Sequence, residues 1–138
     1  MKKYKGYIAV DFDAVLSTYS LPFVHNKFGK PNKEVIKAVN YFYNRGYYIY
    51  IYTGRLHTPK IVKWLKKYRV KYHDFNVCKN YYPYTSKAKL YFDCLIDDKA
   101  INYHFRNNPL NKKQLITEMK RIFNRHNKKG KKWDISDI

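Results

Sequence analysis

Short apolar runs alternate with stretches of helical periodicity along this chain of 138 residues. The runs "YIAVD" at 7–11, "YYIYIYTGR" at 47–55 and "DCLIDD" at 93–98 favour buried strands, and "HDFNVC" at 73–78 is a plausible further strand. Aromatic and β-branched residues fill positions 47–52 without polar interruption, as in a strand that is buried on both faces. The pattern therefore predicts four strands.

Helical spacing appears between these runs. A first helix is predicted to begin at Pro31 and Asn32 and to end at Gly46, a residue typical of helix carboxyl caps. Its apolar positions recur at the spacing of a single helix face: Val35, Ile36, Val39, Phe42 and Tyr43. Thr58 and Pro59 are a good cap and first-turn pair for a second helix through "KIVKWLKKY".

A third amphipathic helix is predicted over 111–126. Its expected inward residues are Leu115, Ile116, Met119, Ile122 and Phe123. The tail at 127–138 is basic and then acidic, and it is either frayed or held back by Trp133 and Ile135. We therefore expect one domain over 1–126 and a basic tail over 127–138 that is either flexible or packed on that domain.

The alternation of strand and helix indicates an α/β protein. We expect a three-layer Rossmann-like fold, in which helices cover both faces of a central parallel sheet through right-handed crossovers. The segment "LSTYSLPFVHNKFGKPN" between the first strand and first helix is long enough for a flap but too short for a separate cap domain. The fold should therefore have a minimal cap or none.

Polar residues follow three of the predicted strands. Asp11 and Asp13 follow the first, Thr53-Gly54-Arg55 the second, and Asp97 and Asp98 the fourth. In an open parallel sheet, ligands bind beyond the carboxyl ends of the strands. If these strands are neighbours, four carboxylates, a hydroxyl and a guanidinium meet at one edge of the sheet.

Crowded carboxylates repel one another, and a hard divalent cation among them offsets that cost. Mg²⁺ commonly uses one or two carboxylates together with waters and a substrate phosphate. Asp11 could then attack phosphorus and form an aspartyl-phosphate, while Asp13 protonates the leaving oxygen and later activates water. Thr53 and a lysine could hold the transferring oxygens.

These residues resemble the four ordered motifs of the haloacid dehalogenase-like superfamily. The matching segments are "DFDAV" at 11–15, "YTGR" at 52–55, a lysine in "SKAKLYFD" at 86–93, and "LIDD" at 95–98. The wording of "GKPNKEVIKAVNYFYNRGYYIYIYTGR" and "KLYFDCLIDDKAINY" is similar to small phage and bacterial members with little or no cap, and the resemblance covers residues 6–105. It implies a Mg²⁺-dependent phosphatase.

The resemblance also implies roles for individual residues. Asp11 would be the nucleophile and a metal ligand, and Asp13 the general acid and base, with its backbone carbonyl on the metal. Thr53 would hold the phosphate. Asp97 would bind the metal, and Asp98 would bind it through water or orient its neighbour.

The remaining positions match the family less closely. Lys89 aligns best with the motif-three lysine, with Lys87 as the alternative, although Leu90 stands where proline often follows. Ala14 replaces the commoner glycine, and Val15 a frequent threonine. Gly54 and Arg55 would help to bind substrate, and Arg55 could contact the leaving group or pair with Asp98.

The charge changes the picture of the substrate. Lys and Arg number 29 against 10 Asp and Glu, for a net charge of +19. This excess reflects either a lysine-rich protein surface encoded by an AT-rich genome, or attraction of the protein to nucleic acid, nucleotides or other phosphorylated molecules. Tyr81, Tyr82 and Tyr84 could stack on bases.

The other residue types narrow the class of protein. Two cysteines, Cys78 and Cys94, are too few for a disulfide framework, fit a reducing cytoplasm, and are expected to be small buried packing residues. The histidines lack the spacing of a zinc site, and His57 reads most simply as a loop residue. We find no transmembrane helix or export signal in the sequence.

The leading hypothesis is a cytoplasmic Mg²⁺-dependent phosphomonoesterase of a bacterium or phage-infected host. It would act through an aspartyl-phosphate on a nucleotide or on a polynucleotide terminal phosphate, with a small sugar phosphate as another option. The alternative is a nucleotide- or nucleic-acid-binding module on the same scaffold with little or no catalysis. The sequence leaves the physiological substrate and the oligomeric state open.

Overall fold

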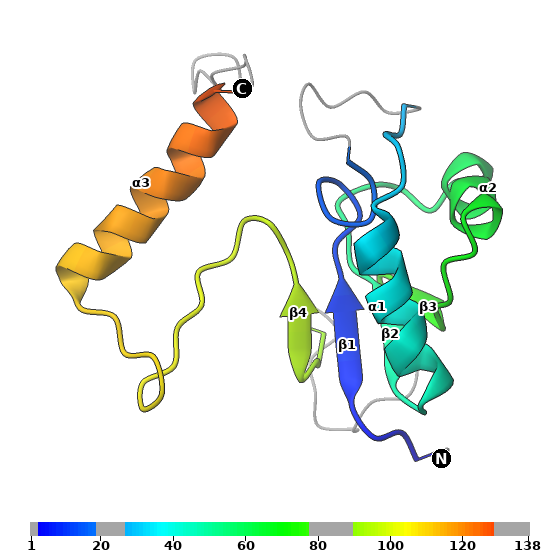
Figure 1. Ribbon diagram of the computed structural model, residues 1–138, viewed down its shortest axis with the longest axis horizontal. Helices are drawn as coiled ribbons and strands as arrows, with labels where there is room; N and C mark the ends of the chain where they lie inside the picture. Colours follow the sequence, from blue (N-terminus) through cyan, green and yellow to red (C-terminus); the bar gives the residue numbers. More distant parts are fainter. Residues whose placement is uncertain (1–2, 19–26, 78–89, 129–138) are drawn as a thin grey trace. The chain divides into compact units, whose positions relative to one another are not determined.

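The computed structural model describes residues 3–18, 27–77 and 90–128, and these divide into two compact units. The first unit runs to Asp98 and contains every described strand and the first two helices (Figure 1). The second begins at Lys99 and contains the last helix. The domain expected over 1–126 therefore spans both units, and most of the tail lies outside the described residues.

The first unit is built on a parallel sheet. Its described strands are β1 (Tyr7–Val10), β2 (Tyr48–Ile51), β3 (Asp74–Phe75) and β4 (Cys94–Ile96), in the spatial order β3-β2-β1-β4. All three neighbouring pairs are parallel. The predicted α/β class with a central parallel sheet is confirmed, although β3 is shorter than the run at 73–78.

The register divides the apolar strand residues between two faces. Val10 pairs with Ile51 and with Ile96, and these rows continue into one buried cluster with residues of both helices of the unit. The opposite face buries Ala9, Tyr48 and Tyr50. β2 is buried along its whole length, as its unbroken apolar run predicts.

The first two helices begin where their sequences predict. α1 (Lys33–Asn44) starts after Asn32, whose side chain accepts a hydrogen bond from the Val35 N–H at 3.4 Å. Gly46 follows with φ of +89°, the left-handed conformation expected of a carboxyl cap. α2 (Pro59–Lys67) starts after Thr58, but this side chain makes no capping hydrogen bond.

α3 (Lys112–Lys128) confirms the predicted third helix. Asn111 and Gln114 cap its start reciprocally, because each side chain accepts from the other residue's N–H at 2.9 Å. Three residues expected to face inward are instead exposed: Ile116 at 41%, Met119 at 46% and Phe123 at 62%. No helix among the described residues is long and apolar enough to cross a membrane.

Cys94 corrects another expectation, because it is exposed rather than buried. It lies on β4, which ends the row of strands and has β1 as its one described neighbour. Cys94 borders an apolar groove of about 190 Å³ that is also lined by Val39 and Phe42 of α1. The edge position explains why the described part of this unit leaves the cysteine uncovered. Cys78 lies outside the described residues.

Candidate functional site

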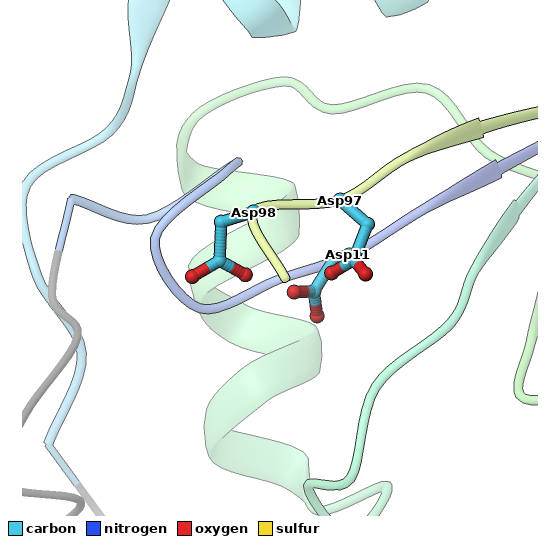
Figure 2. Close-up of side chains that lie close together, drawn as sticks. All are labelled: Asp11, Asp97 and Asp98. Carbon is cyan, nitrogen blue, oxygen red and sulfur yellow. The ribbon is translucent and has the colours of Figure 1, made fainter. Parts of the chain in front are cut away.

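Three of the predicted site residues meet at the carboxyl ends of neighbouring strands. Asp11 directly follows β1, and Asp97 and Asp98 directly follow β4 (Figure 2). The backbone continues the register past the strands, since the Asp11 N–H donates to the Ile96 carbonyl at 2.9 Å. One carboxylate oxygen from each aspartate lies within 4.8 Å of the other two.

The surroundings of Asp11 raise the pKa of this carboxyl group. Burial raises the pKa of Asp11 to about 8, helped by hydrogen bonds with Asp97 and Asp98 and by the negative charge of Asp97. The Phe12 N–H donates to Asp11 Oδ1 at 2.8 Å, and this hydrogen bond by itself lowers the pKa of Asp11. The cluster therefore holds a proton in the absence of a cation.

The donor set fits a hard divalent cation. All three side chains are half-buried and offer only carboxylate oxygens, the ligands that Mg²⁺ and Ca²⁺ prefer. Oxygens within 4.8 Å of one another can share an ion directly, or with one of them bound through water. A cation would also take the place of the proton that Asp11 otherwise holds.

Asp13 is engaged elsewhere. Its Oδ2 accepts from Arg55 Nε at 2.8 Å and its Oδ1 from Arg55 Nη2 at 2.8 Å, which makes a bidentate ion pair. Exposure is 2% for the Arg55 side chain and 18% for that of Asp13. The Arg55 Nη2 also donates to the Lys27 carbonyl at 3.0 Å. The sequence suggested other partners for Arg55, namely a leaving group or Asp98.

The turn after Asp13 contains a residue in a strained conformation. Ala14 has φ of +63°, a left-handed conformation that is costly for a residue with a Cβ. The Ser17 N–H then donates back to the Phe12 carbonyl at 2.9 Å, which closes the loop. This is the position where glycine is commoner in the superfamily that the sequence resembles.

Thr53 and Gly54 lie in the turn after β2. The Thr53 Oγ1 accepts from the Arg55 N–H at 3.1 Å, so its hydroxyl proton remains able to donate to a ligand. Gly54 is exposed, and a Cβ built there would meet nothing within 4 Å. This turn could therefore admit a bulky ligand group.

Asn76 supports this turn, and sequence reasoning missed it. Its Oδ1 accepts from the Thr53 N–H at 2.7 Å, and its Nδ2 donates to the Arg55 carbonyl at 3.5 Å. Asn76 has φ of +54°, a conformation that asparagine tolerates better than most residues. Asn76 follows the apolar part of the run at 73–78, and this polar position at the end of a predicted strand was the signal that could have identified it.

Tyr52 is a second residue that the sequence analysis did not assign to the site. Its N–H donates to the Val10 carbonyl at 2.8 Å, so Tyr52 continues β2 level with Asp11. Side chains alternate along strands, and the Tyr52 ring accordingly lies 6.4 Å from the ring of Tyr50 on the second face. Tyr52 is 43% exposed and can contact a ligand bound beside Asp11.

Other predicted residues are not part of this arrangement. His57 is exposed and stacks on Phe75, with ring centroids 4.6 Å apart, as expected of a loop histidine. Lys87, Lys89 and the three tyrosines proposed for base stacking lie outside the described residues.

Comparison with known proteins identifies a fold but no family. No protein-family model and no curated protein matches the chain. A solved structure, described as a conserved protein coded by a locus of Bacteroides thetaiotaomicron, is similar with a TM-score of 0.55 and 18% identity. The similarity covers 84% of this chain and 89% of that chain. It agrees with a small Rossmann-like α/β fold and says nothing of activity.

Proposed function

We propose that this protein is a Mg²⁺-dependent phosphomonoesterase of the haloacid dehalogenase type. The observation that carries the proposal is the meeting of three carboxylates from β1 and β4, with one oxygen of each within 4.8 Å of the others. Thr53 and Arg55, in the turn after the neighbouring β2, add a hydroxyl and a cation that pairs with Asp13. This combination suits transfer of a phosphoryl group.

Asp11, Asp97 and Asp98 would hold the cation, together with the Asp13 backbone carbonyl. When bound, Mg²⁺ would draw the phosphate toward Asp11 and neutralise negative charge. Asp11 Oδ then forms a bond to phosphorus as the bond to the leaving oxygen breaks, and Asp13 gives that oxygen a proton. Water next attacks phosphorus, Asp13 takes its proton, the bond to Asp11 breaks, and phosphate leaves.

Neighbouring residues would hold the reacting groups in place. The Thr53 hydroxyl would donate to a phosphate oxygen, and Lys89 would supply positive charge to the transferring group. Arg55 fixes the position of Asp13, since the two share a bidentate pair. Asp13 must release one of these hydrogen bonds and take up a proton from solvent before it can protonate a leaving oxygen, so the pair with Arg55 opposes the acid form of Asp13.

The substrate we propose is a nucleotide or the terminal phosphate of a polynucleotide. A net charge of +19 attracts polyanions. The open surroundings of Gly54 leave room for a large leaving group, and the exposed Tyr52 ring offers a surface for a base.

A second candidate is a nucleotide- or nucleic-acid-binding module with little catalysis. The Asp13–Arg55 pair favours it, because each Asp13 oxygen accepts a hydrogen bond from the guanidinium, which stabilises the ionised carboxylate. A binding module needs no free general acid. It needs only positive charge and a site for a phosphate.

Phosphate release from an aryl phosphate separates the two candidates. The enzyme should require Mg²⁺, and Asp11→Asn should abolish turnover while a carboxylate change at the other end of β4, Asp93→Asn, should retain it. Trapping of phosphate on the intact protein, seen by mass spectrometry and absent in Asp11→Asn, would identify the intermediate. Oligonucleotide binding with no turnover of any phosphomonoester would instead support the binding module.

A further inference from the structure

Positive charge is concentrated on α2. Four of its nine residues are lysines, all exposed, and it carries no acidic residue: Lys60, Lys63, Lys66 and Lys67. We call these the α2 lysine face. By contrast, the longer α1 has two lysines and one glutamate, and its Lys37 lies 3.6 Å from Glu34. The charge of this unit is therefore uneven.

The helix that carries the α2 lysine face packs against the segment that joins Asp11 and Asp13. Trp64 of α2 packs on Phe12, the residue between Asp11 and Asp13, with ring centroids 4.9 Å apart. Its indole N–H also donates to the Gly29 carbonyl at 3.1 Å. Lys60 and Lys67 stand four residues before and three after Trp64, about one helical turn away on either side, and both are exposed whereas Trp64 is buried.

The spacing of the lysines suits an extended polyanion. Lys60, Lys63 and Lys67 recur at the i, i+3, i+7 spacing of one helix face. They span roughly 10 Å at the helical rise of about 1.5 Å per residue, the length of about three nucleotides of one DNA strand. A mononucleotide has no phosphate left for these lysines once its own phosphate is at Asp11.

We propose that the α2 lysine face binds the phosphodiester backbone of a polynucleotide strand whose terminal phosphate enters the carboxylate site. This inference rests on the proposed phosphatase function and narrows its substrate from nucleotides to strand ends. Lysine–phosphate contacts carry no sequence information, so the protein would recognise an end of any sequence. The lysines would supply affinity for the strand, and Asp11 with its neighbours would remove the terminal phosphate.

The test is binding of a fluorescent single-stranded oligonucleotide with a terminal phosphate, followed by anisotropy. All proteins are full-length and carry Asp11→Asn, so the phosphate stays on the strand throughout the titration. The test variant adds Lys60→Gln, Lys63→Gln and Lys67→Gln.

The matched control removes the same charge elsewhere. The control variant carries Lys3→Gln, Lys5→Gln and Lys71→Gln. These lysines precede β1 and β3, at the amino ends of the strands, whereas Asp11 follows the carboxyl end of β1. Thermal melts verify that both variants remain folded, as expected for exposed lysines.

The α2 variant should lose roughly 10- to 100-fold in affinity, and the slope of log K against log salt should fall by about 2, at about 0.7 per lost contact. The control should lose less than about threefold on the same grounds. Equal losses in the two variants, or no loss in the α2 variant, would overturn the inference. Binding to phosphatidylserine vesicles that needs these lysines and resists competition by oligonucleotide would overturn it too. If the protein with its native Asp11 showed no turnover, the phosphatase proposal would fail. The binding result of this experiment would still stand.

Discussion

Addition of Mg²⁺ to the metal-free protein should release nearly one proton at neutral pH. The pKa of Asp11 is raised to about 8 by burial and by its two aspartate neighbours. At about pH 7 this carboxyl is therefore roughly nine-tenths protonated, and at about pH 9 roughly one-tenth. Because a carboxylate must lose its proton to bind the ion, binding should release about 0.9 proton at the lower pH and about 0.1 at the higher.

Calorimetric titrations in buffers of different ionisation enthalpy measure this number directly. The apparent affinity for Mg²⁺ should rise about tenfold per unit between about pH 5 and 7 and level off above about pH 9. Asp11→Asn should remove both the proton release and most of the affinity. Asp93→Asn, which takes a carboxylate from the other end of β4, should change neither. Full affinity in Asp11→Asn, or an affinity that is constant from acid to neutral pH, would refute the reasoning.

Four further outcomes are expected. The native state of the metal-free protein holds the Asp11 proton more tightly than the unfolded chain does, so its stability should fall as pH rises from about 4 to about 8; thermal melts should lose this slope in Asp11→Asn, and an unchanged slope would contradict the assignment. Arg55→Met should lower the free energy of unfolding, measured by urea denaturation, by about 3–5 kcal/mol, because it leaves the largely buried Asp13 carboxylate without its partner. A loss below about 1 kcal/mol would show that the pair is solvated. His73→Phe should lower the free energy of unfolding by about 1–3 kcal/mol, because the Ile49 N–H of β2 donates to the imidazole Nδ1 at 3.0 Å and would lose its acceptor. His57→Phe is the matched control, and equal losses in the two variants would count against that hydrogen bond. Tyr52→Ala should lower kcat/KM for a nucleoside monophosphate roughly 5- to 150-fold through lost stacking, while Tyr52→Phe retains it; an equal loss for a sugar phosphate would argue against stacking.

The convergence of Asp11 with Asp97 was predictable because it depends on simple periodicities. Both residues end apolar runs, and parallel strands bring their carboxyl ends to one edge. Neither step needs knowledge of side-chain packing. The helices were predictable for a similar reason, since Asn32, Gly46 and Asn111 act within one turn of their own helix.

The partner of Asp13 was not predictable in the same way. It depends on an arginine 42 positions along the chain, which the sequence does not place beside Asp13. The exposure of Cys94 likewise follows from the place of β4 at the end of the strand row. An apolar run reveals that a strand exists but not which neighbours it has.

The packing of Trp64 gives the protein an internal optical reporter. Its indole touches Phe12 by an edge-to-face contact and holds the Gly29 carbonyl, so it senses the loop that carries Asp11 and Asp13. Binding of a ligand at the carboxylate site should alter tryptophan emission without any added label. Trp133, the other tryptophan in the chain, can be replaced by phenylalanine to leave Trp64 as the single tryptophan.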